Sequence, residues 1–174
     1  MSQPIIKKVW KISNNTIAVC PGSFDPVTMG HIDVIKRTAQ MFSKVIVVVM
    51  QNNAKIPIFT AEERVEMLKL ATRDIPNVEV DMYNGLLADY TKSIGAGAIV
   101  KGLRAMSDFE YEFQMALTNK KLNPSTETVF LTTKAEYMYL SSSMVRQIGK
   151  MGGDISDFVP EIIHDRILSR LQQK

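Results

Sequence analysis

Two kinds of apolar pattern alternate along the chain. Short continuous apolar runs, such as TIAVC (16–20) and KVIVVVM (44–50), are typical of strands that are buried on both faces. Between them lie segments such as HIDVIKRTAQMF (31–42), in which Ile32 and Ile35 fall on one face of a helix. The pattern predicts strands over 16–20, 44–50, 78–83, 98–102 and 128–133, and helices over 31–42, 60–74, 86–95, 108–122, 142–153 and 160–174.

Several of these helices carry signals at their ends. Thr60 and Glu63 have the spacing of a capping box, which predicts that a helix begins after Thr60. Gly95 is typical of a residue that follows the end of a helix. Pro160 is predicted at the first position of the last helix, where a proline is tolerated.

Strands that alternate with helices predict an α/β fold with right-handed crossovers, built on a five-stranded parallel sheet with helices on both faces. Neither a linker nor an internal repeat is visible, so residues 16–174 are predicted to form a single domain. Residues 1–15 form an N-terminal extension, in which VWKI is either an extra edge strand or part of an unstructured arm. Such sheets bind ligands at the carboxyl ends of their strands, so the residues after each strand are the candidates for function.

Composition narrows the class of protein. The 174 residues suffice for one full core, and a net charge of +3 is too small to indicate a nucleic-acid binder. The single cysteine, Cys20, favours a reducing compartment, and its place at the end of an apolar strand favours a buried thiol over a nucleophile. The longest apolar run, 45–50, is too short to span a bilayer, and the first residues lack the shape of a signal peptide. A soluble cytoplasmic protein is therefore expected.

The segment after the first strand has two interpretations. Gly22 allows the backbone to approach a ligand, and the start of the helix at His31 favours an anion. The same helix dipole disfavours a charged imidazole, so His31 is a candidate neutral hydrogen-bond donor. The alternative is that proline, glycine and aspartate merely build a turn, and the residues of this segment alone favour neither interpretation.

Cations and hydroxyls also follow the later strands. Lys101 ends a predicted strand and is followed by Gly102, where the alternative is a lysine that neutralises Asp108 or Glu110 at the surface. A helix N-cap needs only one of the serines 141–143. The candidates at this edge of the sheet are His31, Lys55, Lys101, Arg104, Ser141, Ser142, Ser143 and Arg146. Together they predict a site for several phosphates at once.

The absence of other motifs in the sequence limits the chemistry. There is no P-loop signature and no dinucleotide fingerprint after the first strand. The sequence has only two histidines, which are few ligands for a zinc site. Aspartates do not cluster at strand ends in the way that two-metal chemistry requires. A site rich in cations and poor in bases suits a nucleophile that is already ionised, such as a phosphate that attacks another phosphate.

Two motifs resemble those of the nucleotidyltransferase superfamily. GSFDPVTMGH (22–31) is similar to its T/H-x-G-H motif, and LSSSMVR (140–146) is similar to I-S-S-[ST]-x-x-R. Together with FTAEER, GLLADY and KGLRAMSDFEYE, they resemble the bacterial phosphopantetheine adenylyltransferase family, in order from about Thr16 to the last helix. A different nucleotidyltransferase would share T-x-G-H but lack KGLRAMSDFEYE, and a non-catalytic nucleotide-binding module would have no use for His31 at the α-phosphate.

The resemblance implies a Rossmann-like fold and transfer of adenylate from ATP to 4′-phosphopantetheine, which gives dephospho-coenzyme A and pyrophosphate. It further implies Mg²⁺, a homohexamer in the cytoplasm, and His31 as the stabiliser of the transition state. The residues implied to bind ATP are Ser23, Phe24, His31, Gly102, Leu103, Arg104, Glu112, Tyr137, Met138, Tyr139, Leu140, Ser141, Ser142 and Ser143, and those implied to bind phosphopantetheine are Ser23, Lys55, Leu87 and Lys101. The family often has threonine at Ser23 and arginine at Lys101, and the segment before the serines departs from its usual pattern.

Overall fold

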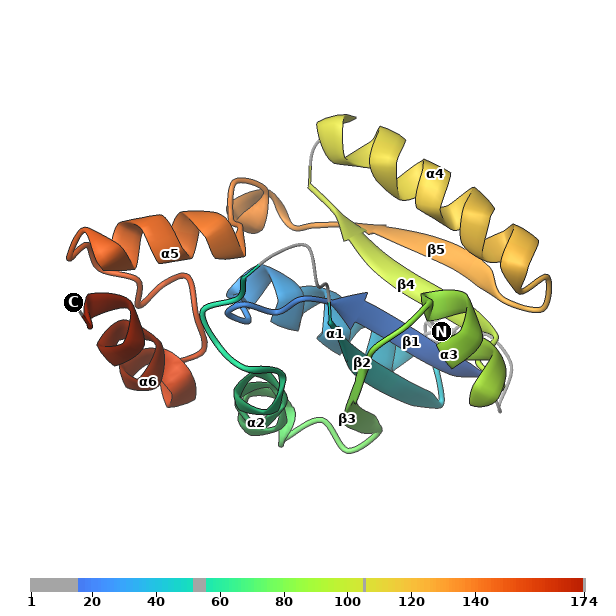
Figure 1. Cartoon of the computed structure of the whole chain (residues 1–174), viewed down its shortest axis with the longest axis horizontal. Helices are drawn as coiled ribbons and strands as arrows, with labels where there is room; N and C mark the ends of the chain where they lie inside the picture. Colours follow the sequence, from blue (N-terminus) through green and yellow to red (C-terminus); the bar gives the residue numbers. More distant parts are fainter. Residues whose placement is uncertain (1–15, 52–55, 105, 174) are drawn as a thin grey trace, which may run out of the picture.

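A five-stranded, wholly parallel sheet forms the centre of the molecule (Figure 1). The computed structural model describes residues 16–51, 56–104 and 106–173. The N-terminal extension, with its segment VWKI, and the candidate residue Lys55 lie outside the described residues. The strands are β1 (Ile17–Gly22), β2 (Lys44–Met50), β3 (Val78–Tyr83), β4 (Ala98–Leu103) and β5 (Glu127–Thr132), in the order β3-β2-β1-β4-β5. The predicted five-stranded parallel sheet is confirmed.

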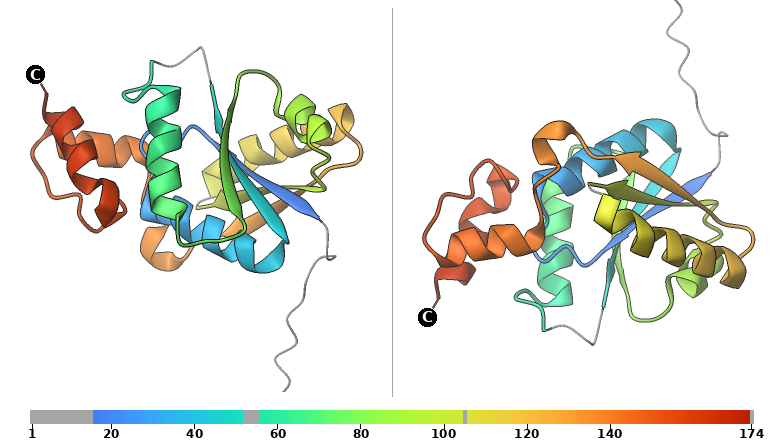
Figure 2. Two further views of the ribbon diagram at one scale, coloured as in Figure 1. Left: turned by 90° about the horizontal axis from the view of Figure 1, so that it is seen from below. Right: turned by 90° about the horizontal axis from the view of Figure 1, so that it is seen from above.

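Helices cover both faces of this sheet, as predicted (Figure 2). They are α1 (Met29–Met41), α2 (Ala61–Thr72), α3 (Leu87–Ser93), α4 (Met106–Leu122), α5 (Ser142–Lys150) and α6 (Glu161–Gln172), with a 3₁₀ turn, η1 (Ala135–Tyr137). Helices α1 and α2 lie on one face, and α3 and α4 lie on the other. In the described parts of the chain, none of the helices is long and apolar enough to cross a bilayer.

The alternation of side chains along the strands explains the continuous apolar runs. In β2, Val45, Val47 and Val49 pack in the main core beneath α1 and α2, whereas Ile46 and Val48 pack in a smaller cluster beneath α3. Successive residues of a strand point to opposite faces, so a sheet that is covered on both faces needs apolar residues at every position.

Some helix boundaries differ from the sequence-based expectation. The prediction that the first helix begins at His31 is wrong by two residues, because Thr28 is the N-cap and its hydroxyl accepts from the backbone N–H of His31. The predicted capping box of Thr60 and Glu63 is confirmed. Pro160 is the N-cap of α6 rather than its first residue, and α3 ends at Ser93, two residues before the left-handed Gly95.

The strand order places the functional edge of the sheet. β1 lies between β2 and β4, so the chain crosses to opposite sides of β1 in the two halves of the fold. This is the switch point at which open α/β sheets bind ligands. Helices α5 and α6 lie beyond the carboxyl ends of the strands, at the left of Figure 1, and extend the structure on this side.

Candidate active site

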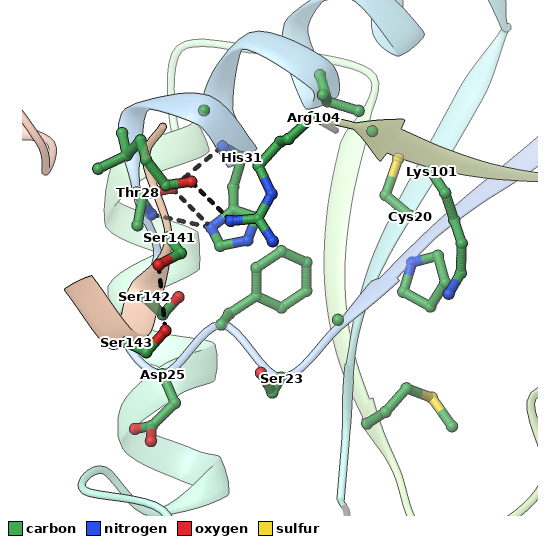
Figure 3. Close-up of a pocket in the computed structure, with 18 of the residues that line it drawn as sticks. Cys20, Ser23, Asp25, Thr28, His31, Lys101, Arg104, Ser141, Ser142 and Ser143 are labelled. Atoms are coloured by element: carbon green, nitrogen blue, oxygen red, sulfur yellow. Dashed lines mark hydrogen bonds between the residues drawn. The ribbon is translucent and has the colours of Figure 1, made fainter. Parts of the chain in front are cut away.

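A cavity of about 630 Å³ opens at the carboxyl ends of β1 and β4 (Figure 3). Its walls come from the loop between β1 and α1, the end of β4, and the starts of α2 and α5. The volume is in the range of pockets that hold small organic ligands. Most of the residues predicted from the strand ends therefore meet around one cavity.

The loop between β1 and α1 has an unusual backbone that depends on Gly22. Phe24 has a φ of 48°, in the left-handed region that a bulky residue rarely adopts. Its ring folds back over Gly22, where an added Cβ would lie 2.9 Å from Cζ of Phe24. The peptide bond between Asp25 and Pro26 is cis. A side chain at position 22 would therefore displace the phenylalanine ring from this place.

His31 lies against this loop, on the first turn of α1. The backbone N–H of Thr28 donates to Nδ1 of His31 at 3.0 Å, and the Thr28 hydroxyl lies 3.1 Å from the same nitrogen. Because Nδ1 accepts a hydrogen bond, the proton of the neutral ring is on Nε2, on the far side of the ring from Thr28. The ring of Phe24 meets the imidazole edge-on, with 5.0 Å between the ring centroids.

The surroundings of His31 keep its imidazole neutral. Burial and, to a smaller extent, the nearby positive charge of Arg104 together lower the pKa of His31 from 6.5 to about 4. The guanidinium of Arg104 is itself placed by a hydrogen bond of 2.8 Å to the carbonyl of Leu140. The expectation that His31 is a neutral donor agrees with this environment. Such a group can stabilise charge that develops on a phosphate without giving up its own proton.

Lys101 points to the face of the sheet that α4 covers. Its neighbour Val100 is in the main core on the other face, and alternation turns Lys101 toward α4. There it forms an ion pair with Glu112, and both side chains are about one-fifth exposed. The partner of Lys101 is therefore Glu112, which also lines the cavity, rather than Glu110, and the side chain of Asp108 lies outside the part of the chain that the structure describes.

The three serines have separate environments at the start of α5. Ser141 is the N-cap, and its hydroxyl accepts from the backbone N–H of Met144 at 3.1 Å. The Ser142 hydroxyl donates to the carbonyl of Pro26 at 2.7 Å, which joins α5 to the loop after β1. The hydroxyl of Ser143 lies 3.1 Å from that of Ser141. The simple N-cap interpretation accounts for only the first of these residues.

The structure brings most of the predicted residues together. Twelve of the candidates line the cavity: Ser23, Phe24, His31, Lys101, Gly102, Arg104, Glu112, Leu140, Ser141, Ser142, Ser143 and Arg146. Five others, all in the described part of the chain, do not line it: Leu87, Leu103, Tyr137, Met138 and Tyr139. Leu87 packs on the cluster beneath α3, and Met138 and Tyr139 are more than half exposed.

Two residues that the motifs did not single out as site residues hold the loop after β1. Asp25 is 6% exposed, and its carboxylate accepts from the backbone N–H groups of Ile58 and Phe59. Arg64 is 4% exposed and donates to the carbonyl of Ser23. Neither role has a local signal, since an aspartate in a turn and an arginine in a helix are both ordinary at the surface.

The described residues offer little to a metal ion. Within 16–51, 56–104 and 106–173, side chains of histidine, cysteine, aspartate and glutamate do not gather in groups of three or more that could hold one. The lining of the cavity instead includes the positively charged side chains of lysine and arginine and the hydroxyl groups of serine and threonine.

Comparison with known proteins identifies the family. Residues 19–148 match the cytidylyltransferase-like family. The phosphopantetheine adenylyltransferase of Caldanaerobacter subterraneus subsp. tengcongensis is 59% identical over 90% of this chain and 98% of that protein. The one from Heliobacterium modesticaldum is 54% identical over 91% of this chain and 92% of that protein. The chain belongs to the phosphopantetheine adenylyltransferase family.

Solved structures agree with this family at the level of the fold. A Plasmodium falciparum nicotinic acid mononucleotide adenylyltransferase, complexed with NaAD, matches with a TM-score of 0.65 and 15% identity, over 89% of this chain and 95% of that one. A lipopolysaccharide core biosynthesis protein from Thermoplasma volcanium matches with a TM-score of 0.52 and 21% identity, over 68% and 97% of the two chains. The predicted Rossmann-like fold of the phosphopantetheine adenylyltransferase family is confirmed.

We expect His31 to titrate far below the usual range, with a midpoint near pH 4 in an NMR titration of the imidazole carbon-bound protons. The folded protein then binds fewer protons than the unfolded chain between the ordinary pKa of 6.5 and about 4. The contribution of neutral His31 to the free energy of unfolding is therefore complete above pH 6.5 and is lost as the pH falls through about 4. His31→Gln assigns the resonance, and a midpoint near 6.5 would contradict the prediction.

Proposed function

We propose that the protein is a pantetheine-phosphate adenylyltransferase, which transfers AMP from ATP to 4′-phosphopantetheine and yields dephospho-coenzyme A and pyrophosphate. Relatives that share half or more of its residues over most of the chain carry this name. The observation that carries the proposal within the site is the neutral imidazole of His31, held at a helix start beside cations and hydroxyls. The reaction contributes to the biosynthesis of coenzyme A.

The chemistry needs placement and charge stabilisation more than a base. A phosphate oxygen of phosphopantetheine attacks the α-phosphorus of ATP and forms a new phosphoanhydride bond. The bond from that phosphorus to the bridging oxygen breaks, and pyrophosphate leaves with the electron pair. The attacking phosphate is already ionised, so a proton need not be removed from it. Nε2–H of His31 is suited to donate to the charge that builds up on the α-phosphate.

We assign the remaining candidates to the two substrates by their place in the family motifs. Those proposed to bind ATP are Ser23, Phe24, His31, Gly102, Leu103, Arg104, Glu112, Tyr137, Met138, Tyr139, Leu140, Ser141, Ser142 and Ser143. Those proposed to bind phosphopantetheine are Ser23, Lys55, Leu87 and Lys101. Eleven of these residues line the cavity and provide most of the support for this assignment.

Mg²⁺ belongs to the proposal as a partner of ATP. The described residues provide cations and hydroxyls rather than a group of carboxylates, which fits an ion that is held mainly by the phosphates of the nucleotide. The ion would neutralise phosphate charge, while Arg104 and the start of α5 hold the nucleotide.

The test of the proposed function is pyrophosphate release by the purified protein with ATP, Mg²⁺ and 4′-phosphopantetheine. Nicotinate mononucleotide replaces phosphopantetheine in a parallel reaction and separates this activity from that of a related nucleotidyltransferase.

We expect His31→Ala to lower kcat about a hundredfold or more and to leave the Kd for ATP almost unchanged, because the donor acts in the transition state. His164→Ala, which removes the other histidine, is the control. Normal turnover in His31→Ala would remove His31 from the mechanism.

Lys101→Ala is expected to raise the KM for phosphopantetheine more than the KM for ATP. Lysine acts as a point charge on phosphate, and its loss also lowers kcat because the attacking group is no longer held in line. Lys101→Arg should retain much of the activity, whereas Glu112→Ala separates loss of the ion-pair partner from loss of the cation. Initial rates with each substrate varied in turn provide the measurement. An unchanged KM for phosphopantetheine in Lys101→Ala would refute the assignment.

We also propose that the protein forms a homohexamer and works in the cytoplasm. Support for assembly comes from α4, where Phe109, Phe113 and Leu117 recur at every fourth position and are each more than a third exposed. The single cysteine is a free thiol, as is usual in reducing compartments.

Light scattering is expected to give six times the chain mass of 19.6 kDa. Leu117→Glu should lower this mass, because it places a charge in the apolar stripe. Gln114→Glu, an exposed change on the same helix, should leave it unchanged. A mass of one chain for the unmodified protein at micromolar concentration would contradict the proposed assembly.

A further inference from the structure

Arg64 is a charged side chain in an almost fully buried place. It lies in the first turn of α2, is 4% exposed and belongs to the wall of the cavity. Its Nε donates to the carbonyl of Thr60 at 3.2 Å, and a terminal guanidinium nitrogen donates to the carbonyl of Ser23 at 2.7 Å. A buried charge is costly unless it is hydrogen-bonded, so these bonds specify the position of the side chain closely.

The loop after β1 and the segment at the start of α2 hold each other by hydrogen bonds in both directions. Arg64, in α2, binds the backbone of the loop, and Asp25, in the loop, binds the backbone of the residues just before α2. Its two carboxylate oxygens accept from the N–H groups of Ile58 and Phe59, both at 3.0 Å. We call these bonds of Arg64 and Asp25 the reciprocal clasp. Arg64 and Asp25 are both charged and buried, so each depends on its hydrogen bonds. The reciprocal clasp therefore fixes the loop after β1 to the start of α2.

The bond to Ser23 sets the orientation of the next peptide group. A carbonyl and the N–H that follows it point in opposite directions across a trans peptide, so the N–H of Phe24 points away from Arg64. The same bond supports the left-handed backbone of Phe24, which is energetically unfavourable for a phenylalanine. This backbone places the ring of Phe24 against His31. Arg64 is thus connected to the imidazole through one peptide group and one ring.

We propose that Arg64 is a positioning residue for adenylyl transfer, which holds the Ser23 carbonyl so that the Phe24 ring stays packed against His31. The inference rests on the proposed function in that the rate it affects is the rate of that reaction. Arg64 acts through its neighbours and without contact to the reacting atoms. In this role the guanidinium provides two directed donors that also carry positive charge, and a lysine can replace at most one of these two bonds.

The test compares Arg64→Gln and Arg64→Lys with Arg166→Gln as the control. Arg166 also links to α2, through Glu66, but from an exposed place away from the cavity. We expect kcat to fall about 10- to 100-fold in Arg64→Gln, which is the loss typical of a charged hydrogen bond, and to fall less in Arg64→Lys. Arg166→Gln should keep the activity of the unmodified protein. Circular dichroism and thermal unfolding identify any variant that fails to fold.

A second measurement follows His31 in the absence of substrates. When the ring of Phe24 leaves the imidazole, His31 becomes less buried and its pKa should rise from about 4 toward 6.5 in Arg64→Gln. Folded Arg64 variants with unchanged kcat and an unchanged titration of His31 would overturn the proposal, as would a change in kcat without a change in the titration. If the unmodified protein releases no pyrophosphate, the proposed function fails, while the titration still tests the contact between Arg64 and the loop. Should Arg64→Gln not fold, Arg64→Lys provides both measurements.

Discussion

The hydrogen bond from the Thr28 amide to Nδ1 of His31 connects the fold to the chemistry. It occupies a backbone donor at the start of α1 that would otherwise need water, and it thereby helps to begin the helix. It also leaves the imidazole proton on Nε2. A protonated Nδ1 could not accept this bond, so the bond opposes the charged ring in addition to the effects of burial and Arg104. One contact thus sets the helix boundary and the tautomer, and it also favours the neutral form of the proposed catalytic group.

The loop after β1 is held mainly through its carbonyl groups. Arg64 binds the carbonyl of Ser23, Arg146 binds that of Asp25, and Ser142 binds that of Pro26. The donors come from α2 and α5, which both follow the loop in the sequence and are far apart from each other along the chain. The loop therefore has a defined shape without secondary structure of its own, and this shape permits the left-handed backbone of Phe24.

Much of the fold and part of the site could be predicted from the sequence. The sequence pattern identified all five strands: the central strands β1, β2 and β4 have continuous buried stretches, whereas the edge strands β3 and β5 are only partly buried. The residues that follow the strands then identified His31, Lys101, Arg104 and the serines. The helix start at Thr28 was missed, because histidine replaces the usual acidic or amide residue of a capping box.

The roles of other site residues depend on contacts between distant segments. Glu112 meets Lys101 only because α4 crosses the face of β4 to which Lys101 points, and Arg64 meets Ser23 only when α2 packs beside the loop. A pattern of neighbouring residues in the sequence does not predict either contact. The same reason explains why Leu87, the first residue of α3, packs against the smaller apolar cluster instead of lining the cavity.

The alternation of side chains between the two faces of β4 limits which changes in sequence length the protein can tolerate. Val100 belongs to the main core on one face, and Lys101 meets Glu112 on the other. Deletion or insertion of a single residue before Val100 would exchange the two faces, so that an ammonium group entered the core while an aliphatic group faced the ligand. Substitutions can alter this strand one side chain at a time, whereas a change in its length would damage the core and the cavity together. Variation in length is therefore restricted to the connecting loops.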